Sequence, residues 1–348
     1  MQTIHWIIKD ITKKDHAIKE AGSVIAQGGL VAFPTETVYG LGANALDGQA
    51  VKSIFQAKGR PADNPLIVHV ATIEEIAKVS SKCTETAHKI MQAFWPGPLT
   101  LVLPKTDSVP KEVTCGLDTV AVRMPNHPVA LKLIMEAGVP VAAPSANLSG
   151  SPSPTTAQHV IDDLEGRING VLDGGPANLG VESTVLDISN EIPIILRPGG
   201  VTAEQLEEVI GPVRHYKGLE NHHSQISPRS PGMKYKHYSP KAGIILIEGQ
   251  AEDIVLHTKE LINRYQKENK KVGVLSSEES AHNYPGTEVL HYGKRNNPAS
   301  AAAVLYAALR SFDLLGVDII IAEGMPETGL GKAVMDRLKR AASSVVRL

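Results

Sequence analysis

The sequence predicts an α/β protein built as two domains, with the larger domain first. Three observations support this prediction. The 348 residues exceed the usual size of a single domain. Short apolar runs alternate with segments of helical periodicity along most of the chain, which is typical of α/β folds. The alternation stops between Pro212 and Lys241, so we expect a first domain at residues 1–212, a basic linker at 213–242 and a second domain at 243–348.

The composition is that of a globular protein, with 42% hydrophobic and 21% charged residues. No run approaches the ~20 apolar residues that a membrane-spanning helix needs. The N-terminus, MQTIHWIIKD, lacks the basic start, long apolar centre and cleavage site of a signal peptide. We therefore expect a cytoplasmic protein without membrane association. Its two cysteines, Cys83 and Cys115, have no metal-ligand spacing and are expected to be reduced thiols.

The net charge of -2 conceals an uneven distribution. Residues 1–212 carry 16 Lys+Arg against 23 Asp+Glu, residues 213–242 carry 6 against 1, and residues 243–348 carry 13 of each. A nucleic-acid-binding domain usually presents a broad basic face, which the acidic first domain does not predict. A small anionic ligand held by a few placed cations fits this distribution better.

Apolar spacing predicts the elements of the first domain in order. Strands are expected near residues 4–8, 30–33, 66–70 and 99–103, at Arg123, at 139–143, before Gly174, from Ser183 and before Arg197; helices are expected over 14–27, from Asp47, ending at Trp95, over 128–137 and from Thr202. Gln205 stands three residues after Thr202, the spacing of a capping box. Trp95 is interpreted as closing its helix end against the core and not as a ligand contact.

The stretch 33–70 has the composition of an anion-binding site. After the strand that ends at Pro34, hydroxyls and glycines form a polar turn, and the following helix ends in Lys58, Gly59 and Arg60. This unit of strand, turn, helix and strand gathers hydroxyls and cations at one place. The loop after residue 143 is also rich in serine, and it is either a ligand-binding loop or an ordinary Ser/Pro turn that caps the next helix.

The linker contains SPGMKYKHYSP, which concentrates lysines, tyrosines and a histidine. It is either a solvated basic tether or a functional segment. The neighbouring His222 and His223 lack further ligands, so no metal site is predicted there.

The second domain alternates strands and helices again, which predicts a small α/β domain with a mostly parallel sheet. Strands are expected over 243–249, 271–277, 287–293 and 318–324, and helices over 251–269, 300–315 and at the C-terminus. The segment GMPETGLGK resembles a phosphate loop, but Leu330 stands where lysine must follow the glycine. We interpret it as a tight turn before a helix, with a regulatory binding role as the alternative.

The chemistry predicted from these residues is electrostatic. No serine-hydrolase elbow, paired metal histidines or histidine-flanked cysteine is present in the sequence. Several strand ends of the first domain deliver hydroxyls or arginine instead, and ligands of open α/β sheets gather at such ends. Positioning and charge stabilisation without a covalent enzyme intermediate suit phosphoryl or nucleotidyl transfer from ATP.

Taken together, the motifs PTETVYGLG, KGRPADNPLIVHV, RMP, PSAN-S and RPG, followed by SPGM-Y-HY-P, resemble the threonylcarbamoyl-AMP synthase family in its two-domain form. The resemblance implies an N-terminal YrdC-like twisted mixed sheet with helices and a smaller C-terminal α/β Rossmann-like domain. It implies a nucleotidyltransferase that makes L-threonylcarbamoyladenylate and pyrophosphate from L-threonine, bicarbonate or CO2 and ATP with Mg2+. The product leads to N6-threonylcarbamoyladenosine in ANN-decoding tRNAs through downstream transfer proteins, with weak tRNA binding by the enzyme itself.

The resemblance also assigns residues. The L-threonine side would comprise Thr35, His69, Arg123, Ala143 and Ser183. The ATP side would comprise the catalytic Lys58 and Arg60, with Asn64, Thr119, Ser145, Asn147, Ser153, Arg197, Tyr235 and His237. No metal ligand of the protein is predicted.

One hypothesis and two alternatives complete these expectations. Lys234, Tyr235, Lys236 and His237 are expected to form a lid over the ATP side, because a basic segment adjoins an acidic domain. The first alternative is an RNA-binding module of the same fold without adenylating activity. The second is carbamoyl transfer from carbamoyl phosphate, a family whose zinc-finger and acylphosphatase-like segments have no counterpart in this sequence.

Overall fold

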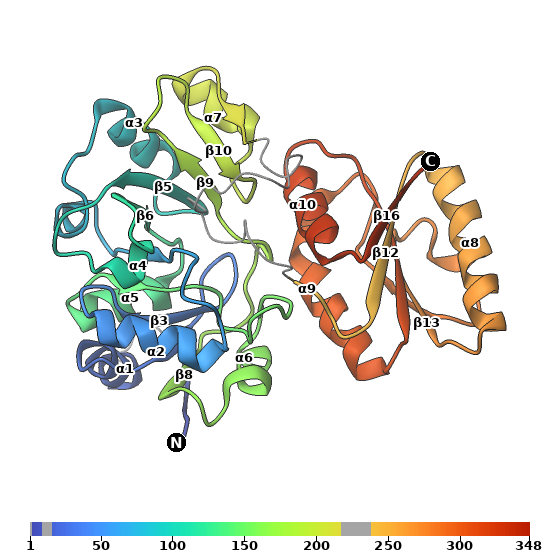
Figure 1. Cartoon of the computed structure of the whole chain (residues 1–348), viewed down its shortest axis with the longest axis horizontal. Coiled ribbons are helices and arrows are strands. Elements are labelled where there is room, and N and C mark those ends of the chain that lie inside the picture. The colour runs from blue at the N-terminus through green and yellow to red at the C-terminus, as the bar shows by residue number, and fades with distance from the viewer. Residues whose placement is uncertain (1, 9–15, 217–237) are drawn as a thin grey trace. The chain divides into compact units, whose positions relative to one another are not determined.

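The computed structural model describes residues 2–8, 16–216 and 238–348. These fall into two compact units (Figure 1). The second unit takes Gly150–Pro152 and Leu179–Val181 together with the C-terminal part of the chain, and the first unit takes the rest. The predicted linker, 213–242, lies largely outside the described residues.

Eleven strands of the described chain form one mixed sheet in the N-terminal unit, in the order β1-β8-β2-β3-β7-β4-β6-β5-β9-β10-β11. The strands are β1 Ile4–Ile7, β2 Val31–Phe33, β3 Gly40–Asn44, β4 Ile67–His69, β5 Leu99–Pro104, β6 Thr119–Arg123, β7 Val141–Ala142, β8 Gly170–Asp173, β9 Thr184–Asp187, β10 Ile194–Arg197 and β11 Arg214–His215. The helices are α1 His16–Ala26, α2 Gly48–Lys58, η1 Glu74–Lys78, α3 Glu85–Phe94, α4 Lys111–Thr114, α5 Pro128–Ala137, α6 Ala157–Leu164 and α7 Ala203–Ile210. The predicted mixed sheet with helices is confirmed.

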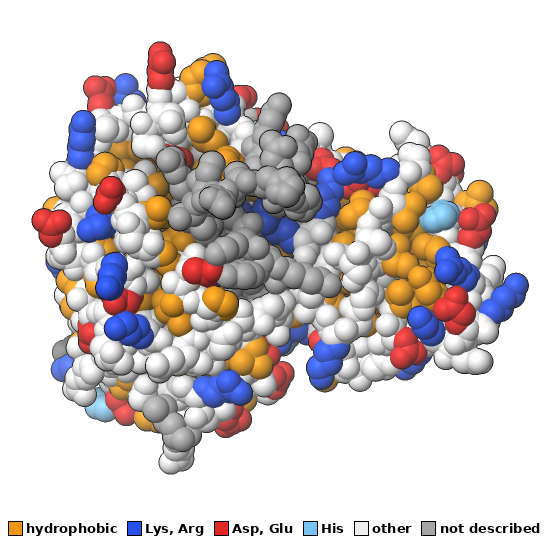
Figure 2. All heavy atoms as spheres, in the orientation of Figure 1, with side chains coloured by type: hydrophobic (Ala, Val, Ile, Leu, Met, Phe, Trp, Pro, Cys, Tyr) orange, Lys and Arg blue, Asp and Glu red, His pale blue; other side chains and the backbone are white. Residues whose placement is uncertain are grey.

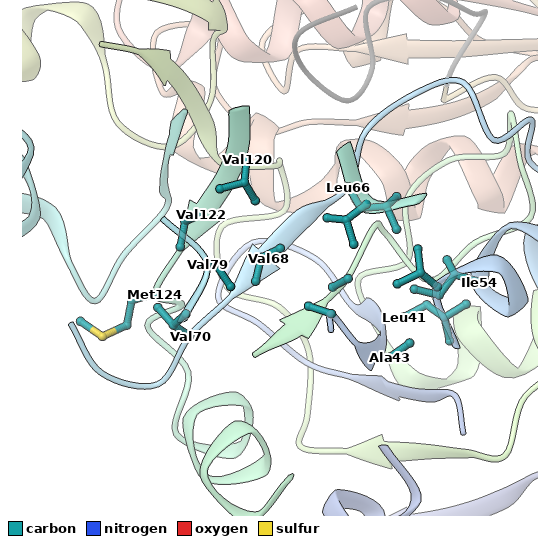
Figure 3. Packing of buried hydrophobic residues seen from close by; sticks show 14 of the residues in the cluster. Leu41, Ala43, Ile54, Leu66, Val68, Val70, Val79, Val120, Val122 and Met124 are labelled. Atoms are coloured by element: carbon teal, nitrogen blue, oxygen red, sulfur yellow. The ribbon is translucent and has the colours of Figure 1, made fainter. Parts of the chain in front are cut away.

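Helices cover both faces of this sheet. Residues of α1 and α5 pack with Val31, Phe33 and Val141 in one hydrophobic cluster. Residues of α2, α3 and α6 pack with the alternate residues of the strands in a second and larger cluster. Figure 3 shows part of the larger cluster, in which Val68 of β4 and Val70, which follows that strand, lie near Val120 and Val122 of β6. Because successive side chains of a strand point to opposite faces, residue 69 and residue 123 face away from this cluster.

Strand β3 is a difference from the sequence prediction, which treated its residues as part of a polar turn. It pairs antiparallel with β2 and with β7. Two glycines conceal it, because glycine has low strand propensity. The structure explains the second of them: a Cβ at Gly42 would come within 2.8 Å of the Phe33 ring and of Val141, so only glycine lets Phe33 lie over this strand.

Local signals elsewhere agree with the structure. Asp47 caps α2 by accepting hydrogen bonds from two backbone N–H groups, and Gly59 ends that helix in the left-handed conformation. Thr202 and Gln205 form the predicted capping box. Trp95 is buried and donates from Nε1 to the Leu99 carbonyl at 2.7 Å, which confirms its structural interpretation.

The C-terminal unit contains five parallel strands in the described residues, in the order β14-β13-β15-β12-β16. Its elements are β12 Gly243–Glu248, α8 Ala251–Lys267, β13 Val272–Ser276, η2 Ala281–Asn283, β14 Glu288–His291, α9 Pro298–Leu315, β15 Ile319–Glu323, α10 Gly331–Ala341 and β16 Ser344–Arg347. The expected parallel α/β domain is confirmed, and β16, which follows the last helix, is an addition to it. Residues 324–330 form the predicted connection to α10.

Glu323 organises the carboxyl end of this smaller sheet. Its carboxylate is fully buried and accepts from the Ser277 N–H at 3.1 Å, the Ser280 hydroxyl at 2.7 Å, the Arg295 guanidinium at 2.7 Å and the Tyr284 hydroxyl. Four donors from this sheet edge therefore satisfy the Glu323 carboxylate. None of the helices among the described residues is long and apolar enough to cross a bilayer.

Candidate active site

Strand register places the candidate residues of the N-terminal sheet in one row. His69 pairs with Arg123 on the neighbouring strand, Thr100 pairs with Val185, and Val185 pairs with Arg197. The pairing of β5 with β6 continues the row from Arg123 to Thr100. Cross-strand partners project from the same face of a sheet, so four polar side chains and Val185 form one row across five strands.

Arg123 is one of the two arginines of the row, and its side chain is buried. Its Nε donates to the Gly97 carbonyl at 3.2 Å, and Nη1 donates to the Thr37 hydroxyl at 2.9 Å. Its Nη2 lies 2.7 Å from Oε2 of Glu36. The loop between β2 and β3 therefore reaches the end of β6 through two consecutive side chains, although only Thr35 of this loop was among the predicted site residues.

His69 is 4% exposed and packs edge-on against Phe33, with ring centroids 6.1 Å apart. Burial, followed by the positive charge of Arg123, lowers the pKa of His69 to about 3. The imidazole is therefore neutral at physiological pH. Its Nδ1 makes no hydrogen bond with any described residue. A neutral ring with an open nitrogen beside an arginine suits the binding of a polar, carboxylate-bearing ligand.

Thr35 and Ala143, the other two residues assigned to the threonine side, lie on neighbouring segments. The Thr35 hydroxyl holds a tight turn by donating to the Val38 carbonyl at 2.6 Å, and it lies 2.7 Å from the Thr37 hydroxyl. Ala143 follows β7 and donates its N–H to the Ile67 carbonyl at 2.9 Å. Thr35 is thus joined to Arg123 through Thr37, while Ala143 borders the strand that carries His69.

Ser183 and Arg197 are directly in contact. Ser183 accepts from the Arg197 guanidinium at its carbonyl, at 2.9 and 3.2 Å, and at its hydroxyl, at 3.1 Å. The same hydroxyl lies 2.8 Å from that of Thr100. The structure therefore brings together a residue assigned to threonine and one assigned to ATP, and it adds Thr100, which sequence reasoning missed.

Lys58 joins two predicted ATP-side residues on a different loop. Its buried ammonium donates to the Ser145 carbonyl at 2.6 Å and to the Asn147 carbonyl at 2.5 Å. The Ser145 hydroxyl in turn donates to the Asn147 side-chain oxygen at 2.6 Å. The end of α2 thus places one cation beside the polar loop that follows β7, which favours the reading of this loop as a site.

Arg60 and Asn64 form a third group. Arg60 donates to the Asn64 carbonyl at 3.1 Å and lies over the Phe55 ring. Asn64 is 1% exposed, and neither polar atom of its side-chain amide has a hydrogen-bond partner among the described residues. An unsatisfied buried amide is costly, and a bound ligand would remove that cost.

Glu182 connects Ser153 to the row of site residues. Its buried hydroxyl donates to the Glu182 carboxylate at 2.6 Å, and Glu182 directly precedes Ser183. Thr119 is partly exposed at the start of β6, four residues before Arg123, and no described contact joins it to the other candidates. Tyr235 and His237, like Lys234 and Lys236 of the proposed lid, lie outside the described residues.

Glu36, Thr100 and Glu182 were not predicted as site residues, and Thr37 was predicted only as a hydroxyl of the polar turn. Glu36 and Thr37 belong to the PTET motif, so the motif itself was the available signal. Thr100 is detectable only from strand pairing and its contact with Ser183, and Glu182 only from its contact with Ser153. Among the residues that the structure describes, no three His, Cys, Asp or Glu side chains are grouped as metal ligands would be.

Comparisons with known proteins point to one family for both parts of the chain. A family model described as "Telomere recombination" matches residues 23–199, and one described as "Threonylcarbamoyl-AMP synthase, C-terminal domain" matches residues 201–343. The threonylcarbamoyl-AMP synthase of Bacillus subtilis is 51% identical over 350 residues, covering 99% of both chains. That of Schizosaccharomyces pombe is 43% identical over 349 residues, covering 90% of this chain and 85% of the other.

A solved structure is similar in both domains. The crystal structure of Pyrococcus abyssi Sua5 complexed with L-threonine has 47% sequence identity and a TM-score of 0.93, with 100% of each chain covered. The family resemblance predicted from the motifs is confirmed. The chain therefore belongs to the threonylcarbamoyl-AMP synthase family, in its two-domain form.

Proposed function

We propose that this protein forms L-threonylcarbamoyladenylate and pyrophosphate from L-threonine, bicarbonate or CO2 and ATP. Relatives that match nearly the whole chain are named for this product, and the similar Pyrococcus abyssi structure holds L-threonine. The observation that carries the proposal is the cross-strand row, in which two buried arginines and a neutral histidine come from strands of one sheet.

The reaction joins two anions, so the first requirement is charge neutralisation. The threonine amine adds to CO2 and gives a carbamate, whose oxygen attacks the α-phosphorus of ATP as pyrophosphate leaves. In our assignment Arg123 binds the threonine carboxylate, because its guanidinium is fixed from two sides. Lys58, Arg60 and Arg197 supply positive charge on the nucleotide side, and these groups stabilise the charge that develops in the transition state.

The second requirement is orientation. ATP enters as its Mg2+ complex, and Mg2+ usually keeps several waters while binding phosphate oxygens. The open amide of Asn64 and the Ser145–Asn147 loop are the groups that we assign to holding the nucleotide. His69, neutral and open at Nδ1, is assigned to the side chain or nitrogen of threonine. Fixing both reactants converts a bimolecular step into an effectively unimolecular one.

The direct test is pyrophosphate release by the purified full-length protein with ATP, Mg2+, bicarbonate and each amino acid in turn. We expect release that requires both threonine and bicarbonate. Release that needs neither, or no release at all, would contradict the proposal. Lys52→Ala provides a matched control for Lys58→Ala, because both lysines lie on α2 and Lys52 is exposed with an ion pair to Glu112.

The place of this reaction in the cell is a further part of the proposal. The adenylate is unstable to water, so we expect transfer proteins to pass its threonylcarbamoyl group to ANN-decoding tRNAs, and we expect the enzyme in the cytoplasm. Basic and acidic side chains are interspersed over the N-terminal unit on the face shown in Figure 2. Steep salt-dependent affinity for tRNA without ATP turnover would instead support the RNA-binding alternative.

A further inference from the structure

Glu36 carries a carboxylate whose buried oxygens have no hydrogen-bond partner of ordinary geometry among the described residues. It lies in the loop between β2 and β3, with a side chain that is 13% exposed. Its Oε2 lies 2.7 Å from Nη2 of Arg123, but neither oxygen has a hydrogen-bond partner of ordinary geometry among the described residues. A carboxylate has about four acceptor sites. Most of the acceptor capacity of Glu36 is therefore open, next to the arginine that we assign to the substrate carboxylate.

Arg123 does not need Glu36 to hold its position. The Gly97 carbonyl and the Thr37 hydroxyl already fix two of its nitrogens. The loop itself is held by the Thr35 hydroxyl, which accepts from the N–H groups of Thr37 and Val38 at 3.2 Å. Glu36 is thus presented by a fixed loop beside a fixed cation, which is the preorganisation expected of a ligand-binding group.

Charge balance indicates what Glu36 binds. An amino acid is a zwitterion, and its ammonium would be unfavourable beside Arg123 without a nearby anion. His69 adds no charge at neutral pH, because burial, followed by the positive charge of Arg123, lowers its pKa to about 3. Burial also lowers the pKa of His127, although the charge of Glu36 opposes that shift. Glu36 and Arg123 together form a dipole that matches the ammonium and carboxylate of an α-amino acid.

We infer that Glu36 binds the α-nitrogen of the amino-acid substrate, while Arg123 binds its carboxylate. The inference rests on the proposed function for the identity of the substrate. After carbamate formation the nitrogen keeps one N–H, which can still donate to Glu36, so the same contact orients the nitrogen before and after CO2 is added. Glu36 is then the residue that distinguishes an α-amino acid from the corresponding α-hydroxy acid.

The test compares two ligands that differ only at this nitrogen. Calorimetric binding of L-threonine and of (2S,3R)-2,3-dihydroxybutanoate is measured for the full-length wild type, Glu36→Gln and Glu112→Gln. Glu112 is a matched control, because its side chain is 17% exposed and it is ion-paired with Lys52. A hydrogen bond to a charged group is stronger than a neutral one by about 1.4 kcal/mol. This difference predicts about a tenfold loss of threonine affinity in Glu36→Gln. Affinity for the hydroxy acid should stay within about threefold, and Glu112→Gln should match the wild type.

Two outcomes would overturn the inference. Equal losses for both ligands would mean that Glu36 only positions Arg123, and no loss for either would mean that Glu36 does not contact the substrate. Glu36→Asp retains the charge, so it should keep the preference for the amine even if both affinities fall. Failure of the proposed function would be distinct, because the wild type would then neither bind threonine nor release pyrophosphate with it.

Discussion

Replacing His69 should flatten the dependence of N-terminal-unit stability on pH. The pKa of this ring is about 3 in the fold, against an ordinary value of 6.5. The unfolded chain therefore binds a proton more tightly than the folded chain, and stability falls as the pH drops from about 6.5 toward 3. With these two pKa values, His69 alone lowers the free energy of unfolding by about 2 kcal/mol when the pH falls from 7 to 5.

The assay is urea unfolding followed by tryptophan fluorescence. The chain has two tryptophans, and Trp6 and Trp95 both belong to the N-terminal unit. Their fluorescence therefore reports on that unit alone. His69→Gln removes the titrating ring, so its unfolding free energy should change by about 2 kcal/mol less than that of the wild type between pH 7 and pH 5. His88→Gln is the control, because His88 is exposed on α3 and is solvated in both states.

If His69→Gln and the wild type lose the same free energy over this pH range, His69 is not protected from protonation by the fold. The neutral role that we assign to it beside Arg123 would then be wrong. A difference between the two proteins with the opposite sign would contradict the burial argument itself, because it would require tighter proton binding in the folded state.

Three further predictions concern other parts of the structure. Lys58→Ala removes a buried ammonium bound to two carbonyls, and we expect pyrophosphate release to fall at least 100-fold while Lys52→Ala stays near the wild-type rate. Gly42→Ala should destabilise the N-terminal unit by about 1–3 kcal/mol in urea, because its Cβ would lie 2.8 Å from Phe33 and Val141; Gly40→Ala, whose nearest contact is 3.3 Å, should cost less. Glu323→Gln breaks a buried ion pair with Arg295 and should cost about 3–5 kcal/mol, visible by circular dichroism but not by tryptophan fluorescence; coincident losses in both signals would contradict independent units.

The sequence predicted the elements whose signals are local. Asp47 before an amphipathic helix, Gly59 after it and the Thr202–Gln205 pair each act within a few residues, so their structures follow from short-range chemistry. The motif resemblance named His69 and Arg123 as candidate site residues. What it did not supply was the register that sets those two side chains beside each other.

Features that depend on distant pairing were not predictable from one sequence. Strand β3 was hidden by its two glycines, and Gly42 is needed to accommodate Phe33, a contact that only the folded sheet shows. Thr100 has no local signal at all, since its importance comes from its contact with Ser183. Glu36 was passed over because a lone carboxylate in a loop is ordinary until its open oxygens are seen beside Arg123.

The cross-strand row also has a consequence for biosynthesis. Arg123 meets Thr37 across 86 residues of sequence, and Thr100 meets Ser183 across 83. Contacts this distant in the chain close late and slowly during folding. A nascent chain must have emerged from the ribosome beyond Arg197 before the row exists, so fragments that end earlier should lack affinity for the amino acid. Threonine binding would then serve as a marker of the moment at which the central sheet of a newly made molecule is complete.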